Sequence, residues 1–278
     1  MSCSAQHVTA TTLENVRIAE RTYRIRLAAP TIAARIRPGQ FVMLRLPGRT
    51  DPLLGRPFAL YDTVLNDVGD PIAFDVVYLV IGKMTQPLSE VQPGEPIEII
   101  GPLGNGFQDL PPCDEVHLVA GGIGQTPFLA TIRNLLGTRG YGGQPAQRIA
   151  QRVTLFYGVR TASLAAGVAD FEAAGATVRL SSDDGSIGES GRVTTLLATF
   201  PRASAILTCG PEPMLKAVAE FAIQANIPCQ VSLETPMACG IGICFSCVAP
   251  IYQSDGGWDY KRVCVEGPIF PAKSIRWG

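Results

Sequence analysis

The chain has 278 residues, enough for two or three domains, and 46% of them are hydrophobic. Its 23 basic and 24 acidic residues leave a net charge of −1, which gives no electrostatic case for nucleic acid or an anionic membrane as a partner. The apolar runs are shorter than the roughly 20 residues of a membrane span, and the N-terminus lacks the basic start and apolar core of a secretory signal.

The first part of the chain, residues 1–110, is typical of an all-β domain. Short runs that alternate apolar and polar residues, or are mostly apolar, are separated by turn signals such as Pro38-Gly39 and Pro93-Gly94. These runs occupy residues 16–29, 41–47, 58–62, 74–80 and 96–101. Five or six short strands in about a hundred residues predict a small antiparallel β-barrel.

The pattern changes in residues 111–227, after a stretch rich in proline and glycine at 101–114. Apolar runs that we expect as buried strands lie at 116–120, 152–159, 177–184 and 205–210. Segments that we expect as helices lie at 127–136, 163–175 and 213–224. Strands that alternate with helices predict right-handed βαβ units and a parallel-sheet α/β domain. The remaining residues, 228–278, are rich in loops and predict a third, small domain.

Three cysteines near the C-terminus, Cys239, Cys244 and Cys247, form a C-x4-C-x2-C array, and Cys264 supplies a fourth thiol. This is the spacing of a plant-type [2Fe-2S] site, in which soft thiolate ligands hold the irons. Glycines between the first two cysteines let the backbone wrap closely around a cluster. The alternatives are a structural zinc site and unrelated buried cysteines. Zinc sites usually contain two C-x2-C pairs and this segment has one, so the array favours an iron–sulfur cluster.

The other four cysteines, Cys3, Cys113, Cys209 and Cys229, are scattered singly along the chain. Disulfide pairing among them is therefore not expected. Free thiols beside a cluster motif indicate a reducing compartment, so the sequence predicts the cytoplasm.

The segment AGGIGQTPF follows an expected strand and opens an expected helix. Gly121, Gly122 and Gly124 allow the backbone to approach a phosphate closely, while Thr126 and Pro127 suit the N-cap and first turn of the helix. The free N–H groups of a helix N-terminus favour a pyrophosphate there. The pattern is not G-x-G-x-x-G, and a glycine turn required only for tight packing is the alternative.

Three weaker signals point to cofactor contacts. The strand-turn-helix segment CGPEPML places Cys209 near the carboxyl edge of the expected sheet, where ligands bind, although a buried cysteine is the commoner role. Arg56 and Phe58 share one face of a strand, so a guanidinium and a ring could meet a pyrophosphate and a flat cofactor. A solvated arginine beside a core phenylalanine is the alternative. Thr85, at the expected start of a short helix, is another phosphate-type position.

The order of these segments is more specific than any one of them. RPFA, a helix-opening threonine, GPLGNGF, AGGIGQTP, YGVR, CGPEPML and the cysteine array follow one another in a single chain. Over about residues 10–225 this order resembles the ferredoxin–NADP reductase-like flavoproteins. With the C-terminal array, the chain is similar to the electron-transfer subunits of NAD-dependent dihydroorotate dehydrogenases.

The resemblance implies a residue set for each cofactor. FAD would be held by Arg56, Pro57, Phe58, Ala59, Val77, Tyr78, Leu79, Met84 and Thr85. The nicotinamide dinucleotide would contact Gly121, Gly122, Gly124, Thr126, Cys209, Gly210 and Pro211. The cluster would be held by Cys239, Cys244, Cys247 and Cys264. Ala59 stands where the family usually has Ser or Thr, and Met84 where it usually has Gly, which puts the flavin potential and the rate of hydride transfer in doubt.

The implied function is electron transfer. FAD exchanges hydride with a nicotinamide and releases electrons singly, whereas a [2Fe-2S] cluster accepts one at a time. No acid or base is required, and we interpret His7 as part of a disordered tail and His117 as an ordinary strand residue. The implied partner is an FMN-containing dihydroorotate dehydrogenase catalytic subunit, in a heterotetramer of two of each chain that serves pyrimidine biosynthesis. Electrons would run from dihydroorotate through FMN, the cluster and FAD to NAD+.

Two other functions fit parts of the pattern. The same module serves ferredoxin:NADP oxidoreductases, hydrogenases and sulfite reductases, and a scaffold that binds a nucleotide and zinc belongs to a different class. Asp183 and Asp184 favour NAD over NADP if they lie near Arg160, because a 2′-phosphate would meet like charge. Trp258, between the third and fourth cysteines, is a candidate contact with the partner or a cover for the cluster.

Overall fold

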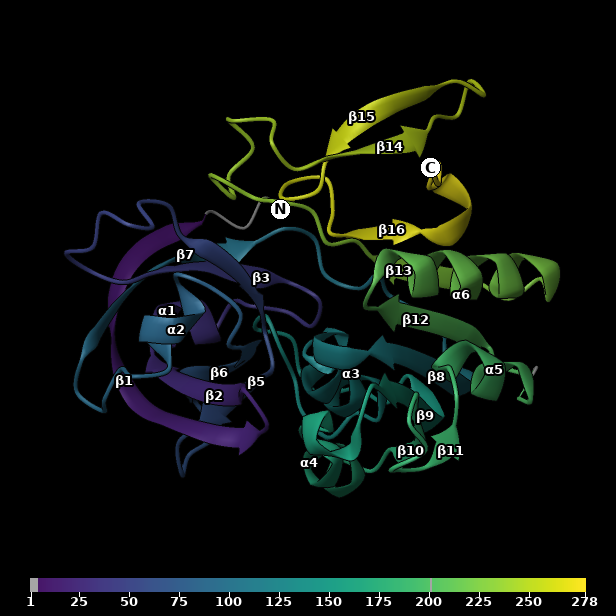
Figure 1. Cartoon of the computed structure of the whole chain (residues 1–278), viewed down its shortest axis with the longest axis horizontal. Coiled ribbons are helices and arrows are strands. Elements are labelled where there is room, and N and C mark those ends of the chain that lie inside the picture. Colours follow the sequence, from purple (N-terminus) through teal and green to yellow (C-terminus); the bar gives the residue numbers. More distant parts are fainter. Residues whose placement is uncertain (1–4, 201) are drawn as a thin grey trace.

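The computed structural model describes residues 5–200 and 202–278, so Cys3 lies outside the described residues. The first sheet has seven antiparallel strands in the order β4-β3-β7-β1-β2-β6-β5, drawn in purple to blue in Figure 1. They are β1 (Gln6–Ala19), β2 (Thr22–Ala28), β3 (Phe41–Arg45), β4 (Arg56–Ala59), β5 (Asp62–Leu65), β6 (Pro71–Leu79) and β7 (Pro96–Leu103), with the short helices α1 (Pro30–Ala33) and α2 (Thr85–Leu88) between them. Among the described residues no pairing joins β4 to β5, so the barrel is open at that seam. The prediction of a disordered tail at His7 was wrong, because His7 lies in β1 and pairs with Ile100 of β7.

Alternating residues produce this barrel. In β2, Ile25 and Leu27 are fully buried, while Arg24 and Arg26, which alternate with them, lie outside the core. The expected single run at 16–29 is in fact a hairpin. It turns at Arg21, whose φ of 52 is left-handed. No glycine or proline marks this turn, which is one reason why the sheet has more strands than the sequence predicts.

The second sheet has the order β11-β10-β9-β8-β12-β13-β16, and all of its pairs are parallel except β13 with β16. Its strands are β8 (Cys113–Gly121), β9 (Ala150–Val159), β10 (Thr177–Ser182), β11 (Glu189–Ser190), β12 (Ala205–Cys209), β13 (Cys229–Ser232) and β16 (Ile269–Pro271). Its helices are α3 (Phe128–Leu135), α4 (Val168–Ala173), α5 (Val193–Ala198) and α6 (Glu212–Gln224). The predicted antiparallel barrel and parallel α/β domain are confirmed.

Helices cover both faces of this sheet, which is why its strands are apolar throughout. Leu118 packs in one core with Phe128 of α3, and its neighbour Val119 packs in another with Leu215 of α6. The helix expected at 163–175 is shorter than predicted, because Gly167 adopts a left-handed φ of 76 just before α4 begins. Helix α5 and the short strands β11, β13 and β16 were not predicted.

The order of the sheet reverses beside β8. From β8 the chain continues to β9 and β10 on one side, and then returns to β12 on the other side. The carboxyl ends of β8 and β12 therefore border the crevice in which open α/β sheets bind ligands.

The C-terminal part lies above both sheets in Figure 1, in yellow-green and yellow. It contains the cysteine loop and an antiparallel hairpin of β14 (Val248–Tyr252) and β15 (Trp258–Arg262), and it ends with β16 and the 3-10 helix η3 (Ala272–Ser274). Ala249 and Ile251 face inward, whereas Tyr252, Trp258 and Tyr260 are exposed. No helix in the described part of the chain is long and apolar enough to cross a bilayer.

Candidate functional site

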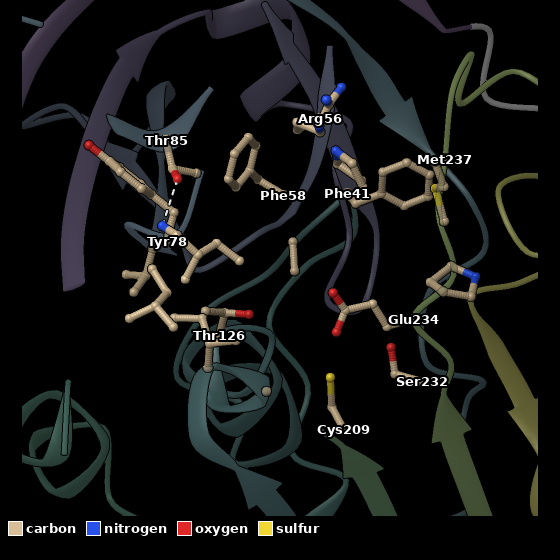
Figure 2. A pocket seen from close by; sticks show the side chains of 18 of the residues that line it. Phe41, Arg56, Phe58, Tyr78, Thr85, Thr126, Cys209, Ser232, Glu234 and Met237 are labelled. Atoms are coloured by element: carbon tan, nitrogen blue, oxygen red, sulfur yellow. Dashed lines mark hydrogen bonds between the residues drawn. The ribbon is translucent and has the colours of Figure 1, made fainter. Parts of the chain in front are cut away.

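A cavity of about 540 Å³ lies where the three parts of the chain meet. This volume is within the usual range for a cofactor site. Twelve of the residues predicted to bind FAD or the nicotinamide line it: Arg56, Pro57, Phe58, Ala59, Val77, Tyr78, Leu79, Met84, Thr85, Gly124, Thr126 and Cys209. Figure 2 shows side chains from the barrel facing Thr126 and Cys209 of the nucleotide domain across this space.

Aromatic rings form the barrel side of the cavity. The ring of Phe58 packs edge-on against Tyr78, with 5.9 Å between the ring centroids. The Tyr78 hydroxyl donates to Asn15 Oδ1 at 2.9 Å, and burial raises the pKa of Tyr78, so this hydroxyl stays protonated. The fixed apolar wall suits a flat ring system such as a flavin.

A threonine and a methionine shape the end of the cavity near α2. Thr85 Oγ1 accepts hydrogen bonds from the N–H groups of Ile81 at 2.9 Å and Gly82 at 3.1 Å, and so tightens the turn that begins α2 (Figure 2). Met84 is 4% exposed and packs in the barrel core. The barrel therefore accommodates a long side chain where the family usually has glycine.

The guanidinium of Arg56 is exposed at the mouth of the cavity. It donates to the carbonyl oxygens of Leu54 at 2.9 Å and Gly55 at 3.0 Å. Since both acceptors are neutral and exposed, its charge is available to an anionic group. Arg56 and Phe58 both border the cavity, as their shared strand face predicts.

The glycine turn after β8 forms the 3-10 helix η1 (Gly122–Gln125), and α3 begins at Phe128. A Cβ at Gly121 would lie 2.8 Å from Pro211 Cδ, and one at Gly124 would overlap the Cys209 carbonyl, so these two glycines let the turns after β8 and β12 touch. A Cβ at Gly122 would meet nothing within 4 Å, and this leaves open space beside the turn. Tight packing thus explains two of the three glycines.

Some predicted residues lie away from the first cavity. Gly210 and Pro211 line a neighbouring cavity of about 930 Å³, which shares Arg56 and Pro57 with the first. Gly121 and Gly122 line neither. The prediction of Thr126 as helix N-cap was wrong: Pro127 occupies the N-cap of α3, and no side chain caps it.

Lys83, Ser232, Glu234 and Met237 are among the lining residues that sequence reasoning missed. Lys83 Nζ forms an ion pair with Asp51 at 2.7 Å. Glu234 borders both cavities, and its carboxylate lies between Cys209 and Met237 in Figure 2. Its position two residues after the short strand β13 was the only signal in the sequence, and β13 itself was not predicted.

The four array cysteines come together in two pairs. Cys244 lies beside Cys239, and Cys264 lies beside Cys247. A hydrogen bond with Ser246 lowers the pKa of Cys244 to about 6, and burial raises the pKa of Cys264 to about 12. Because a [2Fe-2S] cluster takes two ligands on each iron, this donor set fits a two-iron cluster. Within the described residues, no three His, Cys, Asp or Glu side chains converge to hold a single metal ion.

Close packing of glycines sets the shape of the cluster loop. Gly240 and Gly242 have left-handed φ angles of 72 and 84. A Cβ on Gly240 would lie 2.5 Å from Met43 of β3, so the loop rests directly on the barrel. Cys244 is exposed, whereas Cys247 and Cys264 are 1% exposed. The site therefore has one face toward the barrel and one toward solvent.

Two family models match the chain. The oxidoreductase FAD-binding domain matches residues 8–107, and the iron-sulfur cluster binding domain of dihydroorotate dehydrogenase B matches residues 234–276. A structure of an NADH-dependent reduced ferredoxin-NADP oxidoreductase, described for flavin-based electron bifurcation, aligns with a TM-score of 0.79 and 27% identity, covering 100% of this chain and 92% of that one. Fold and matches together define a ferredoxin reductase-like flavoprotein oxidoreductase with an iron–sulfur domain, and they favour iron–sulfur over zinc.

Relatives of similar length specify the family further. The protein of Desulforamulus reducens named dihydroorotate dehydrogenase B (NAD(+)), electron transfer subunit, is 34% identical over 263 residues, which cover 94% of each chain. The protein of the same name from Geobacillus thermodenitrificans is 37% identical over 261 residues, covering 93% of this chain and 94% of that one. The chain belongs to the family of dihydroorotate dehydrogenase B electron transfer subunits, as the sequence predicts.

Proposed function

We propose that this chain passes electrons between a [2Fe-2S] cluster, FAD and NAD, and so couples dihydroorotate oxidation on a partner subunit to NAD+ reduction in pyrimidine biosynthesis. The observation that carries the proposal is the shared cavity. Its walls come from the barrel, from the turns after β8 and β12, and from Thr235 and Met237 beside the cluster loop. A flavin ring in this cavity would border both the nicotinamide site and the cluster.

The proposed roles follow from the positions of the side chains. Arg56 and Thr85 would hold the FAD phosphates, while Phe58 and Tyr78 would pack near its ring. The open space beside Gly122 would admit the nicotinamide dinucleotide. FAD supplies hydride exchange with the nicotinamide and single-electron exchange with the cluster. The units 1–110, 111–227 and 228–278 would serve FAD, NAD and cluster respectively.

NAD is the proposed nicotinamide. The N–H of Asp183 donates to Val159 O at 3.1 Å, and that of Asp184 to Arg160 O at 3.3 Å, so the two aspartates lie beside Arg160 at the ends of β9 and β10. Ser186 donates hydrogen bonds to Asp184 and lowers the pKa of its carboxyl group, which keeps it charged. Two negative charges at this edge would repel a 2′-phosphate.

The partner that we propose is the FMN-containing catalytic subunit, in a heterotetramer of two of each chain. Around the exposed Cys244, the side chains of Ile241, Ile243 and Phe245 are 43%, 75% and 61% exposed. An apolar rim around the exit for electrons suits a protein interface. Trp258 is also exposed, but it lies on the hairpin and is covered in part by Arg276, 4.1 Å from its ring. The seven described cysteines are free thiols, which supports the cytoplasm as its location.

Reconstitution tests the proposal. The chain, mixed without oxygen with a catalytic subunit from the same organism, should form NADH from NAD+ and dihydroorotate, and neither chain should do so alone. Ile243→Glu should abolish this coupling but leave NADH oxidation by a two-electron dye unchanged. Val68→Glu, at a similarly exposed apolar residue on a barrel turn, is the matched control. If the chain oxidises NADH with the dye and transfers electrons to ferredoxin, but the mixture does not oxidise dihydroorotate, the chain belongs to another reductase complex.

A further inference from the structure

The turn Gly104-Asn105-Gly106, part of the GPLGNGF segment, lies between the barrel and the segment that follows Cys264. Asn105 makes four hydrogen bonds across this junction. Its Nδ2 donates to Glu266 O at 3.1 Å and Ile269 O at 2.9 Å, and its Oδ1 accepts from the Ile269 N–H at 3.0 Å. Its backbone N–H donates to Gly267 O at 2.6 Å. Both N–H donors of the Asn105 side-chain amide and its oxygen acceptor therefore form hydrogen bonds with one short segment of the chain.

The turn is equally fixed to the barrel. Gln40 Nε2 donates to Gly104 O at 2.7 Å, and the Phe107 N–H donates to Pro38 O at 3.0 Å. Gly104 has a φ of +70, and a Cβ there would lie 2.6 Å from Pro268 Cδ. The backbone of the turn thus touches the cluster side directly, which requires glycine.

From Asn105 a continuous series of hydrogen bonds reaches the cluster loop. Glu266, whose carbonyl accepts from Asn105, also accepts through Oε2 from the Arg262 N–H at 2.8 Å. Arg262 Nη1 then donates to Gly242 O at 3.1 Å, between the first two array cysteines. Pro268, held in the same segment, lines the flavin-sized cavity. One bonded chain therefore connects the barrel, the cavity wall and the cysteine loop.

We propose that Asn105 is a positioning residue that sets the separation between the flavin cavity and the cluster loop, and thereby the rate at which electrons pass between them. This inference rests on the proposed function. The nicotinamide side of the cavity is held by other contacts, in which Asp62 of the barrel pairs with Arg133 of α3. Loss of the Asn105 contacts should therefore slow transfer to the cluster and spare hydride transfer.

Asn105→Asp tests this in the loaded protein. Aspartate has nearly the same shape as asparagine. It replaces the two N–H donors of the amide with a carboxylate oxygen, which would face the carbonyl oxygens of Glu266 and Ile269. With FAD and iron content unchanged, NADH-driven reduction of the cluster after rapid mixing should slow by at least about tenfold, as small misplacements of reacting groups do. NADH oxidation by a two-electron dye should keep its rate. Hydrogen exchange measured by mass spectrometry should be faster in residues 265–270, a readout that does not depend on activity.

Two further variants complete the test. Asn105→Ala removes the same bonds without adding charge, and it should show the same pattern if the aspartate variant does not fold. Asn66→Asp is the matched control, since the Asn66 side chain accepts hydrogen bonds from the N–H groups of Val68 and Asp70 through Oδ1, which aspartate retains, in a distant turn. Cluster reduction at the wild-type rate, or dye activity that falls in parallel, would overturn the role of Asn105. Wild-type protein in which NADH never reduces the cluster would instead refute the proposed function.

Discussion

Asp62 joins the FAD barrel to the nucleotide domain through one buried carboxylate. Its side chain is 8% exposed and contacts Arg133 Nη1 at 2.8 Å, Arg139 Nη1 at 3.0 Å and the hydroxyl of Tyr141 at 2.6 Å. Burial, together with the negative charge of Asp62, raises the pKa of Tyr141, so its hydroxyl stays a donor. We predict that Asp62→Asn strongly lowers the free energy of unfolding.

The magnitude follows from the burial of the partners. Removing one member of a buried charged pair costs about 3–5 kcal/mol, because the other charge stays unpaired. The side chains of Arg133 and Arg139 are 26% and 21% exposed, so solvent screens part of this penalty and about 2–4 kcal/mol is expected. Tyr141→Phe removes one neutral donor and should cost roughly 1 kcal/mol.

Urea unfolding followed by tryptophan and flavin fluorescence measures these differences. Asp70→Asn, which makes the same change in an exposed turn of the same domain, should stay within about 0.5 kcal/mol of wild type. A similarly small effect of Asp62→Asn would show that the carboxylate does not stabilise the junction, and the reasoning would be refuted.

Three further predictions concern other parts of the chain. Cys244→Ser should abolish the iron–sulfur signal in electron paramagnetic resonance while dye-linked NADH oxidation persists; unchanged iron content would contradict the cluster assignment. Gly124→Ala should weaken NADH binding or folding, because its Cβ would overlap the Cys209 carbonyl, and unchanged stability with an unchanged KM for NADH would exclude this. Burial lowers the pKa of His117 below 6.5, so the unfolded chain binds the proton more tightly and stability should fall as the pH drops below that value. His117→Gln should reduce this loss between pH 7 and pH 5 in thermal unfolding, and an unchanged pH dependence would refute the role of His117.

Local patterns made part of this protein predictable. The cysteine spacing lies within one loop and one following segment, so it could be identified without knowing the fold. The strands β8, β9 and β12 were also predicted from local sequence. Each is a continuous apolar run, and such a run indicates a buried strand without knowledge of the rest of the fold. The hairpin at Arg21 was missed because alternation continues through a turn that contains no glycine or proline.

Other features depend on contacts between distant segments. Glu234 enters the cavity only because β13 pairs with β12, and the four-residue strand β13 was too short to predict. The braces formed by Asp62 and Asn105 each join residues more than 70 positions apart. Such contacts leave no periodic pattern in the sequence.

The central claim is that NAD, FAD and the cluster exchange electrons within this chain on behalf of dihydroorotate oxidation. An anaerobic titration followed by visible absorption and electron paramagnetic resonance tests it most directly. NADH should reduce both centres with about three electrons per chain, two on FAD and one on the cluster. Dihydroorotate should reduce the same two centres once the FMN-containing catalytic subunit is added. If dihydroorotate leaves both oxidised in a complex that NADH reduces, the chain serves a different partner and the account is contradicted.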